Sequence, residues 1–289
     1  MLMKSVEYVR PDTAEQALEI LRLQEGAVPL AGGQSLINIL KQRVGSVRVL
    51  VDISSLAELR TIARGADGSL DVGACVTYDE LDKSAEVRAG HRIVSEVAAQ
   101  IEDQQIRNRG TIGGNCCLGD PTNNLPVLLV ALGATMRVRS ARASRELPAE
   151  SFFTGFFTTA LQPGELLTSV SIPALAAGEG VGYSSLNVAA QSKTIVRAAA
   201  LVRADRVIHE ARVVLARLGP MPIRHRGMED ALRGSAPTEQ VVRQAAETIG
   251  GDLDPISDSH GDAEYRREMA KVVASRAVLE AIGMNGRRS

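Results

Sequence analysis

Two short segments place paired glycines beside small polar residues, a combination that lets a backbone approach a bound phosphate. The first is Ala31-Gly32-Gly33-Gln34-Ser35, which follows an apolar run and precedes a segment with helical spacing. Glycine tolerates positive φ, and a helix N-terminus offers unpaired N–H groups and the positive end of its dipole. The segment therefore suits a phosphate, although a tight strand–helix turn without a ligand has the same pattern. It matches neither the P-loop nor the GxGxxG pattern.

The second segment is Thr111-Ile112-Gly113-Gly114-Asn115, inside a polar, glycine-rich stretch that we predict to be a loop over Arg107–Pro121. Thr111 and Asn115 can donate hydrogen bonds to phosphate oxygens or ribose hydroxyls. Asp120 can accept from a hydroxyl, or it can begin the next helix as its N-cap. Two such segments in one chain favour a clamp around a pyrophosphate, and so a dinucleotide held between two domains. Spacing alone does not separate FAD from NAD, and it names no reaction.

The other residues with catalytic or metal-binding potential give weaker signals. Three cysteines cannot supply a four-thiolate iron–sulfur cluster, and they form no framework of paired disulfides: Cys75, Cys116 and Cys117. None of the four histidines stands in an HxxxH or HExxH pair, so no metal site is predicted. His225 lies between two arginines and is predicted to be solvated surface. Arg107 and Arg109, beside the second segment, have the same simple interpretation.

Composition narrows the class of protein. The chain has 289 residues, 23% of them charged, with a net charge of −1, which is typical of a globular protein and gives no basic excess for nucleic acid. Four Phe, four Tyr and no Trp leave few rings on which bases could stack. No apolar run approaches the roughly 20 residues of a membrane span, and the N-terminus lacks the features of a signal peptide. We therefore expect a cytoplasmic protein without a membrane span.

Hydrophobic patterning predicts a mixed α+β chain without internal repeats. Strands are predicted over 6–9, 49–53, 69–74, 135–138, 166–172, 195–202 and 207–218. Helices are predicted over 36–40, 93–101, 125–132, 230–232, 239–249 and 262–282. Thr13 and Thr77 each begin a capping-box pattern, with Gln or Glu three residues later. The small, glycine-rich segment 174–182 is predicted to be a linker.

With their surroundings, the two glycine segments resemble the two FAD motifs of a known family. The family is the FAD-binding medium subunit of molybdenum hydroxylases, which include carbon monoxide dehydrogenase and xanthine dehydrogenase. The resemblance covers nearly the whole chain, and its second motif is long and specific. The matching positions are 31–36, Lys41, Arg43, 105–115, Asp120, Pro121, Leu125, Pro126, 163–167, 263–266 and Met269.

The resemblance implies a fold and a set of cofactor-binding residues. Residues 1–55 and 56–175 would form a vanillyl-alcohol-oxidase/PCMH-type FAD-binding fold of two subdomains. Residues 176–289 would form a C-terminal α+β domain like that of the carbon monoxide dehydrogenase flavoprotein. FAD would bind non-covalently, with no catalytic side chain. The implied contacts are Ala31, Gly32, Gly33, Gln34, Ser35, Leu36, Ile101, Gly110, Thr111, Gly113, Gly114, Asn115, Cys117, Asp120, Asn124, Leu166, Leu167, Asn187 and Ile195.

Some of these residues have an implied place along the cofactor. The two motifs would hold the pyrophosphate from opposite sides, and Asp120 would face the ribityl or ribose region. Leu167 would pack near the ring system, and Ile195 would stack over the isoalloxazine. Two positions depart from the family pattern: Asn187 stands where relatives often carry Lys, and Asn124 where they often carry an acidic residue. Both departures remove charge near the cofactor, which leaves the fold expectation intact and the flavin potential open.

The implied function is that of an oxidoreductase subunit that transfers electrons. A large subunit with the molybdenum cofactor and a small subunit with [2Fe–2S] clusters would pass electrons to FAD on this chain, in a dimer of heterotrimers. A self-sufficient flavin oxidoreductase of the same FAD-binding fold is the alternative, and a nucleotide-binding regulatory module without redox activity is a third possibility. The sequence determines neither the substrate of the molybdenum subunit nor the electron acceptor, which could be NAD, oxygen, a quinone or another carrier.

Overall fold

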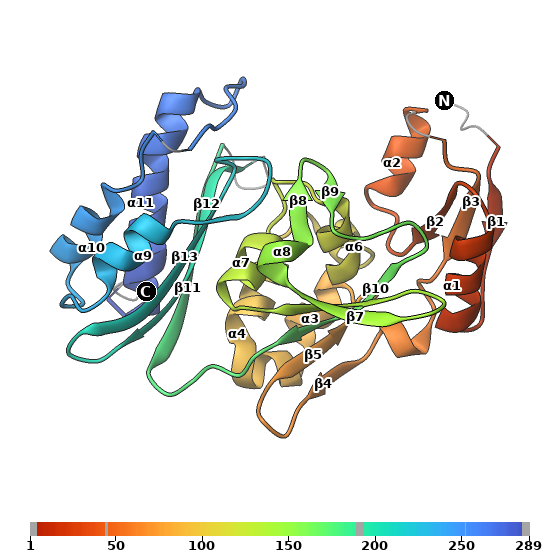
Figure 1. Cartoon of the computed structure of the whole chain (residues 1–289), viewed down its shortest axis with the longest axis horizontal. Helices are drawn as coiled ribbons and strands as arrows, with labels where there is room; N and C mark the ends of the chain where they lie inside the picture. The colour runs from red at the N-terminus through yellow and green to blue at the C-terminus, as the bar shows by residue number, and fades with distance from the viewer. Residues whose placement is uncertain (1–4, 44–45, 189–193, 252, 285–289) are drawn as a thin grey trace.

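The computed structural model describes residues 5–43, 46–188, 194–251 and 253–284. Three lobes follow one another along the long axis of the molecule in chain order, with the N-terminal lobe at one end and the C-terminal lobe at the other (Figure 1). Each lobe is built on a sheet of its own. The predicted mixed α+β architecture is confirmed. No helix within the described ranges is both long enough and apolar enough to cross a membrane.

The N-terminal lobe is a small parallel sheet with its helices. The sheet order is β1–β3–β2, and the central strand runs parallel to both neighbours. The elements are β1 (Glu7–Val9), α1 (Ala14–Leu23), β2 (Ala27–Leu30), α2 (Leu36–Lys41), β3 (Val49–Asp52) and the 3-10 helix η1 (Ala57–Leu59). Helix α1 buries Leu18 and Leu21 in a core that also holds Val51. The first glycine motif leaves the carboxyl end of β2, where ligands bind in open parallel sheets.

The middle lobe has a five-stranded antiparallel sheet in the order β4–β5–β10–β6–β7. Its strands are β4 (Ile62–Arg64), β5 (Leu70–Gly73), β6 (Thr135–Arg139), β7 (Ser144–Pro148) and β10 (Leu166–Ile172), with a separate hairpin of β8 (Phe153–Gly155) and β9 (Thr158–Thr159). Its helices are α3 (Tyr78–Lys83), α4 (Ala85–Ala99), α5 (Gln104–Arg107), α6 (Ile112–Leu118), α7 (Leu125–Ala131) and α8 (Ala149–Phe152). All seven residues of α7 are buried, because the helix packs between this lobe and the next.

The two predicted capping boxes have different outcomes. At Thr13 only half of the box forms: Gln16 N donates to Thr13 Oγ1 at 3.2 Å, while the Gln16 side chain accepts from Asp12 N instead of from Thr13 N. At Thr77 the box is complete, because Glu80 N donates to Thr77 Oγ1 and Thr77 N donates to Glu80 Oε2. This second box fixes the start of α3 beside the second glycine motif, where Tyr78 N donates to the carbonyl of Gly110 at 3.0 Å.

The predicted loop over Arg107–Pro121 is wrong in its centre, because Ile112–Leu118 form the helix α6. Thr111 is the N-cap of this helix, and its Oγ1 accepts from Gly114 N at 3.0 Å. Ile112 and Cys116, one turn apart, are fully buried on the same face. Glycine has a low intrinsic preference for helix, but tertiary packing overrides such preferences. The cap and the buried face therefore decide the local structure here.

The C-terminal lobe is an antiparallel sheet in the order β11–β12–β13–β14, covered on one side by three helices (Figure 1). The elements are β11 (Glu179–Asn187), β12 (Thr194–Ala204), β13 (Ile208–Ala216), β14 (Ile223–Arg224), α9 (Arg226–Leu232), α10 (Glu239–Ala246) and α11 (Ala263–Ala281). The predicted linker over 174–182 is too long, because β11 begins at Glu179. Gly180 and Gly182 lie in that strand, where an added Cβ would come within 2.0 Å of a carbonyl oxygen of α11. These two glycines therefore permit close packing of α11 rather than flexibility.

The prediction of a solvated His225 is also wrong. The residue is 4% exposed, and its Nδ1 accepts from Met228 N at 3.1 Å as the N-cap of α9. The neighbouring Arg224 forms an ion pair with Glu229, at 2.8 Å between Nη2 and Oε2. Flanking charges in the sequence therefore did not imply solvent, because the side chains of a strand end point in different directions.

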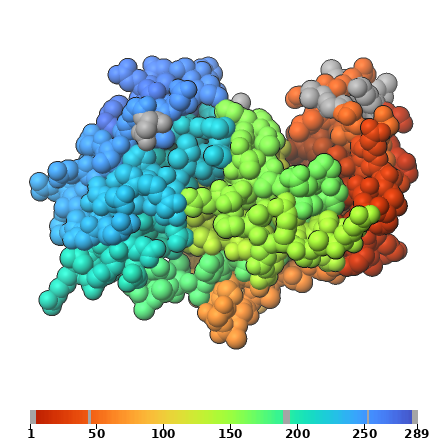
Figure 2. Space-filling view, in the orientation of Figure 1, coloured from red at the N-terminus to blue at the C-terminus, as the bar shows by residue number. Residues whose placement is uncertain are grey.

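The two junctions between lobes differ in how they are packed. The middle and C-terminal lobes share one hydrophobic core, in which Ala199 and Val214 lie with Leu128. The N-terminal lobe has a separate core, joined to the middle lobe by few apolar residues such as Leu166. Figure 2 shows the surface hollowed between the N-terminal and middle lobes. A ligand cavity is therefore to be sought at the less tightly packed junction, which is also where the two glycine motifs lie.

Candidate functional site

The first glycine motif forms a concave run of free backbone donors between β2 and α2. Gly33 has φ +73°, a conformation that costs an L side chain about 1 kcal/mol or more. Within the part of the chain that the structure describes, no backbone N–H from Gly32 to Leu36 donates a hydrogen bond. Ser35 is the N-cap of α2, and its side chain makes no capping bond. Successive unpaired N–H groups around a left-handed residue form an anion-binding concavity.

The second glycine motif uses its backbone donors within the fold. Ile112 N donates to the carbonyl of Val76 at 3.0 Å, and Gly113 N donates to the carbonyl of Ala74 at 2.9 Å. An added Cβ on Gly113 would lie 2.5 Å from the Ala74 side chain, so this glycine is needed for helix α6 to reach the end of β5. What this motif offers a ligand is therefore its side chains, chiefly the hydroxyl of Thr111 and the amide of Asn115, and a close backbone surface at Gly114.

The two motifs are in contact across the junction of the lobes. A Cβ on Gly32 would lie 2.0 Å from the carbonyl oxygen of Arg109, just before the second motif. A cavity of about 280 Å³ runs beside this contact. It is lined by Val28, Pro29, Ala31, Gly32, Gly33, Gln34, Ser35, Leu36, Ile39, Ile53, Ala74, Tyr78, Gly110, Thr111, Gly113, Gly114, Asn115, Cys117, Leu118, Asn123, Leu166 and Leu167. The wall combines polar side chains and glycine backbone with apolar side chains, as a dinucleotide with a flat ring requires.

Most of the site residues predicted from the sequence line this cavity together. They are Ala31, Gly32, Gly33, Gln34, Ser35, Leu36, Gly110, Thr111, Gly113, Gly114, Asn115, Cys117, Leu166 and Leu167. Segments more than 130 residues apart in sequence, from Ala31 to Leu167, therefore meet at one place. Their individual contacts with a cofactor remain predictions.

The other predicted site residues lie outside the described wall of this cavity. Ile101 is buried just beyond α4, and Asn187 is exposed at the end of β11. Ile195 packs in the core of the C-terminal lobe. Asn124, not Asp120, is the N-cap of α7, so the N-cap alternative for Asp120 is wrong. Asp120 Oδ1 instead accepts from Thr122 N at 2.8 Å and closes a local turn.

Sequence reasoning missed several residues of the wall. The most informative is Tyr78, which the sequence places outside both glycine segments, and whose hydroxyl accepts from Asn115 Nδ2 at 3.0 Å. Burial raises the pKa of Tyr78 well above its ordinary value, so the hydroxyl stays protonated. The pairing joins residues 37 positions apart and leaves no local signal. The apolar run ending at Leu30 did carry a signal, because Val28 and Pro29 line the cavity.

Asn115 carries an unmet hydrogen-bonding group in the cavity wall. Its Oδ1 is buried and has no partner in the described structure. A buried polar atom without a partner costs about 1–3 kcal/mol. Exchanging the amide O and N would satisfy Tyr78 and leave the NH₂ group free instead. In either orientation one polar atom of Asn115 remains available to a ligand.

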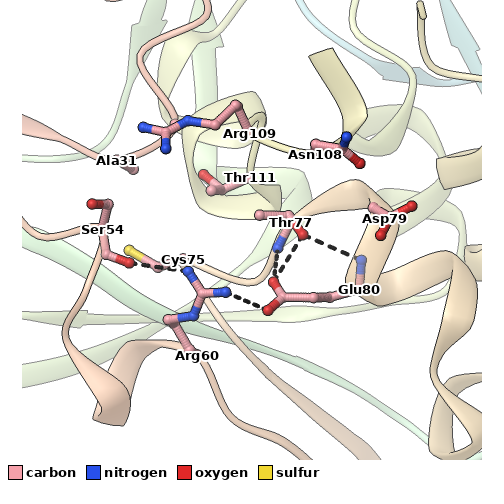
Figure 3. A pocket seen from close by; sticks show the side chains of 11 residues that line it. Ala31, Ser54, Arg60, Cys75, Thr77, Asp79, Glu80, Asn108, Arg109 and Thr111 are labelled. Carbon is pink, nitrogen blue, oxygen red and sulfur yellow. Dashed lines mark hydrogen bonds and ion pairs between the residues drawn. The ribbon is translucent and has the colours of Figure 1, made fainter. Parts of the chain in front are cut away.

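A second, polar cavity of about 320 Å³ adjoins the first one (Figure 3). The two share Ala31, Gly32 and Thr111, and Arg60 forms an ion pair with Glu80 across the floor of the second. Cys75 also lies in its wall, but burial raises the pKa of this thiol to about 12, so it is not a thiolate at neutral pH. We interpret this cavity as the polar extension of the first one.

The fold and the cavity define a class of protein: one that holds an extended nucleotide cofactor between two α+β lobes and packs a third lobe against the second. Residues 4–175 match the model of the FAD binding domain in molybdopterin dehydrogenase, and residues 183–281 match the CO dehydrogenase flavoprotein C-terminal domain. The chain therefore belongs to the family of FAD-binding medium subunits of molybdopterin dehydrogenases.

Comparison with individual proteins agrees with this assignment. The chain is 32% identical to the carbon monoxide dehydrogenase medium chain of Hydrogenophaga pseudoflava, over 97% of this chain and 98% of that one. It is 33% identical to the glyceraldehyde dehydrogenase medium chain of Sulfolobus acidocaldarius, over 94% and 97%. A solved structure of carbon monoxide dehydrogenase from Hydrogenophaga pseudoflava superimposes with a TM-score of 0.93, at 32% identity, over 98% of this chain and 99% of that chain.

The residues of the cavity fit FAD. The free N–H groups of the first motif can hold a phosphate, and the unpaired amide atom of Asn115 can meet a phosphate or hydroxyl on the other side. The glycine surfaces leave room that a Cβ would fill, at Gly33 and at Gly114. Leu166 and Leu167 provide an apolar wall for a ring system. The donor set and the shape therefore agree with the family assignment.

Proposed function

We propose that this FAD-binding oxidoreductase subunit works as an electron carrier. The observation that carries the proposal is the chemistry of the cavity wall. Among the described lining residues, only Tyr78 and Cys117 can titrate, and burial raises the pKa of both, that of Cys117 to about 12. The charged side chains Arg60, Asp79, Glu80 and Arg109 line only the polar extension, not the cavity that holds Leu166 and Leu167. A cavity wall without a charged acid or base can orient a redox cofactor but cannot exchange protons with a substrate. When bound, FAD supplies the redox chemistry.

The chain's own residues would bind the cofactor without taking part in its redox reaction. The N–H groups from Gly32 to Ser35 would bind one phosphate, and Thr111 with Asn115 would bind the other. Non-covalent attachment follows, because Cys117 is a protonated thiol and no histidine lines the cavity among the described residues. Contacts of Asp120, Asn124, Ile101, Asn187 and Ile195 with FAD stay predictions, supported so far only by the family resemblance.

The partners are inferred from the relatives, two of which are named as medium chains of dehydrogenases. We infer that a large subunit with the molybdenum cofactor and a small subunit with [2Fe–2S] clusters assemble with this chain, as a dimer of heterotrimers. The apolar packing between the middle and C-terminal lobes supports a rigid platform for such an assembly. The cytoplasmic location and the domain bounds at 55/56 and 175/176 also stay predictions; the separate sheets of the three lobes support the latter.

The proposal is tested on the complex purified from its native host and on this chain alone. We expect the complex to contain a large and a small partner chain and to oxidise a substrate of the large subunit. We expect the FAD-loaded chain alone to turn over no substrate, yet its flavin should bleach when it is mixed anaerobically with the reduced iron–sulfur subunit. Acid precipitation should release all of the flavin into solution.

The matched control is the same chain without FAD, which should leave the reduced clusters unchanged. Substrate turnover by the FAD-loaded chain alone would favour the self-sufficient oxidoreductase instead. A chain that binds FAD but accepts no electrons from the reduced clusters would contradict the electron-transfer role while leaving the family assignment intact.

A further inference from the structure

A buried arginine on the C-terminal lobe reaches the cavity wall from outside. Arg197 lies on β12 and is 3% exposed. Its Nη1 donates to the carbonyl oxygens of Thr122 at 2.8 Å and Asn123 at 2.7 Å, and its Nη2 donates to Thr194 Oγ1. Among the described residues, its Nε has no hydrogen-bond partner and no carboxylate forms an ion pair with it. Burying a charge without a counter-charge costs several kcal/mol, so this placement needs an explanation.

The carbonyls that Arg197 holds belong to the segment that completes the cavity. Asn123 lines the cavity, and its Nδ2 donates to the carbonyl of Asn115 in the second glycine motif at 2.7 Å. Asp120 closes the turn that precedes this segment. A second side chain of the C-terminal lobe binds the same segment, because the Tyr183 hydroxyl donates to the carbonyl of Asn124 at 3.3 Å. Three successive carbonyls are therefore held by the third lobe.

The two gripping side chains also contact each other. The guanidinium carbon of Arg197 lies 5.9 Å from the centre of the Tyr183 ring, a cation–π arrangement. Burial raises the pKa of Tyr183 to about 12, with the charge of Arg197 acting in the opposite direction, so the hydroxyl remains a donor. On its other side Arg197 is linked through Thr194, whose hydroxyl donates to Asn187 Oδ1 at 2.8 Å. The arrangement is a fixed positive charge, one peptide carbonyl away from the cavity.

We propose that Arg197 is a positioning residue that couples the C-terminal lobe to the flavin site. It holds the segment 120–124 so that Asn123 forms the cavity wall, and its uncompensated charge makes the bound flavin easier to reduce. A buried positive charge favours the form of a nearby group that carries more negative charge, and reduction adds electrons. The inference rests on the FAD site, and it deepens the proposed electron-transfer role by identifying one residue that acts on the potential.

The test compares three variants of the full chain. Arg197→Met removes the charge and keeps a long side chain. Arg197→Lys keeps the charge, but its ammonium cannot bind two carbonyls as the planar guanidinium does. Tyr183→Phe removes only the bond to Asn124. The measurements are FAD affinity by fluorescence titration and the flavin midpoint potential of the loaded chain, equilibrated with redox dyes. Thermal unfolding of each variant reports whether the fold is kept.

We expect Arg197→Met to weaken FAD binding about tenfold and to weaken binding of the reduced flavin a further tenfold. For a two-electron couple that second factor lowers the midpoint potential by about 30 mV. Arg197→Lys should weaken FAD binding similarly and keep the wild-type potential. Tyr183→Phe should change affinity by less than a factor of three and leave the potential unchanged.

Equal potentials in wild type, Arg197→Met and Arg197→Lys would overturn the electrostatic role, and equal affinities would overturn the positioning role. If Arg197→Met does not fold, the comparison of Arg197→Lys with wild type decides: a potential that falls in the lysine variant contradicts the proposal. Because dyes set the potential, this result is independent of whether the iron–sulfur subunit reduces the flavin. Failure of the electron-transfer role and failure of this inference are therefore distinguishable.

Discussion

The two motifs share a Gly-Gly pair, but their backbones have opposite physical roles. In the first, the backbone N–H groups from Gly32 to Leu36 have no partner among the described residues, and Gly33 takes a left-handed conformation. In the second, the N–H groups of Ile112, Gly113 and Gly114 are all used by the fold. The donors of the first motif are therefore free to bind a ligand, whereas the glycines of the second motif allow α6 to pack against the middle sheet. A glycine pair in a sequence therefore does not reveal which of the two it is.

This difference separates binding from stability. A change in the first motif should alter mainly ligand affinity, because no hydrogen bond within the described part of the chain depends on its backbone donors. A change at the buried position of the second motif should alter the fold itself, because the helix cannot otherwise approach the carbonyl of Ala74. The variants below are chosen to break this contrast if it is wrong, and each adds one methyl group so that their effects can be compared.

The largest effect is expected from Gly113→Ala. The new Cβ would lie 2.5 Å from the Ala74 side chain and 2.6 Å from its carbonyl oxygen, so α6 must move away from the sheet. Overpacking of this kind costs about 1–3 kcal/mol, and the backbone contact places this case at about 3 kcal/mol of unfolding free energy. Chemical denaturation of the FAD-free chain measures it. Gly251→Ala, with no described atom within 4 Å of the added Cβ, is the control and should be close to wild type. A loss below 1 kcal/mol for Gly113→Ala would show that α6 is not wedged.

The next effect is expected from Gly32→Ala. Here the added Cβ would lie 2.0 Å from the carbonyl oxygen of Arg109, so the two lobes must separate at the point where the motifs touch. The pyrophosphate clamp then widens, and we expect at least a hundredfold loss of FAD affinity, about 2.7 kcal/mol. The free chain should lose less stability than Gly113→Ala does, because the N-terminal lobe has its own core. Fluorescence titration with FAD measures the affinity, and retention within tenfold of wild type would contradict the clamp.

Much of this difference between the two glycine motifs could not be predicted from the sequence, for a physical reason. The strand and helix periodicities, the Thr77 capping box and the family motifs are local patterns, and the structure confirms the elements that they predict. The helix α6, the buried His225 and the early start of β11 depend on contacts between segments far apart, such as Gly113 with Ala74 and Gly182 with Ala277. Local propensity cannot report such contacts, because the same glycines are equally compatible with a loop.

The candidate site divides in the same way. The residues of the two motifs and Leu166–Leu167 were predictable, because the family resemblance marks them directly. Tyr78 and Asn123 were not, since each enters the wall only through a hydrogen bond to Asn115. Arg197 was still harder to predict from the sequence, because it contacts the cavity wall only through the carbonyl of Asn123. The sequence therefore predicted the residues that would face a ligand better than the residues that hold them in place.

The smallest effect is expected from Gly114→Ala, which sharpens the comparison within the second motif. Gly114 is exposed in the cavity wall, and among the described atoms only Thr111 Oγ1 is close to an added Cβ, at 3.0 Å. Its φ is not positive, so alanine is compatible with the helix and adds some helix propensity. We therefore expect the free energy of unfolding to stay within about 0.5 kcal/mol of wild type. FAD affinity should fall about tenfold, or 1.4 kcal/mol, because the methyl group occupies the surface where a phosphate would approach. Denaturation and FAD titration on the same preparation separate the two quantities.

If Gly114→Ala loses stability as Gly113→Ala does, the whole motif is structural. If it loses neither stability nor affinity, the phosphate does not pass over α6.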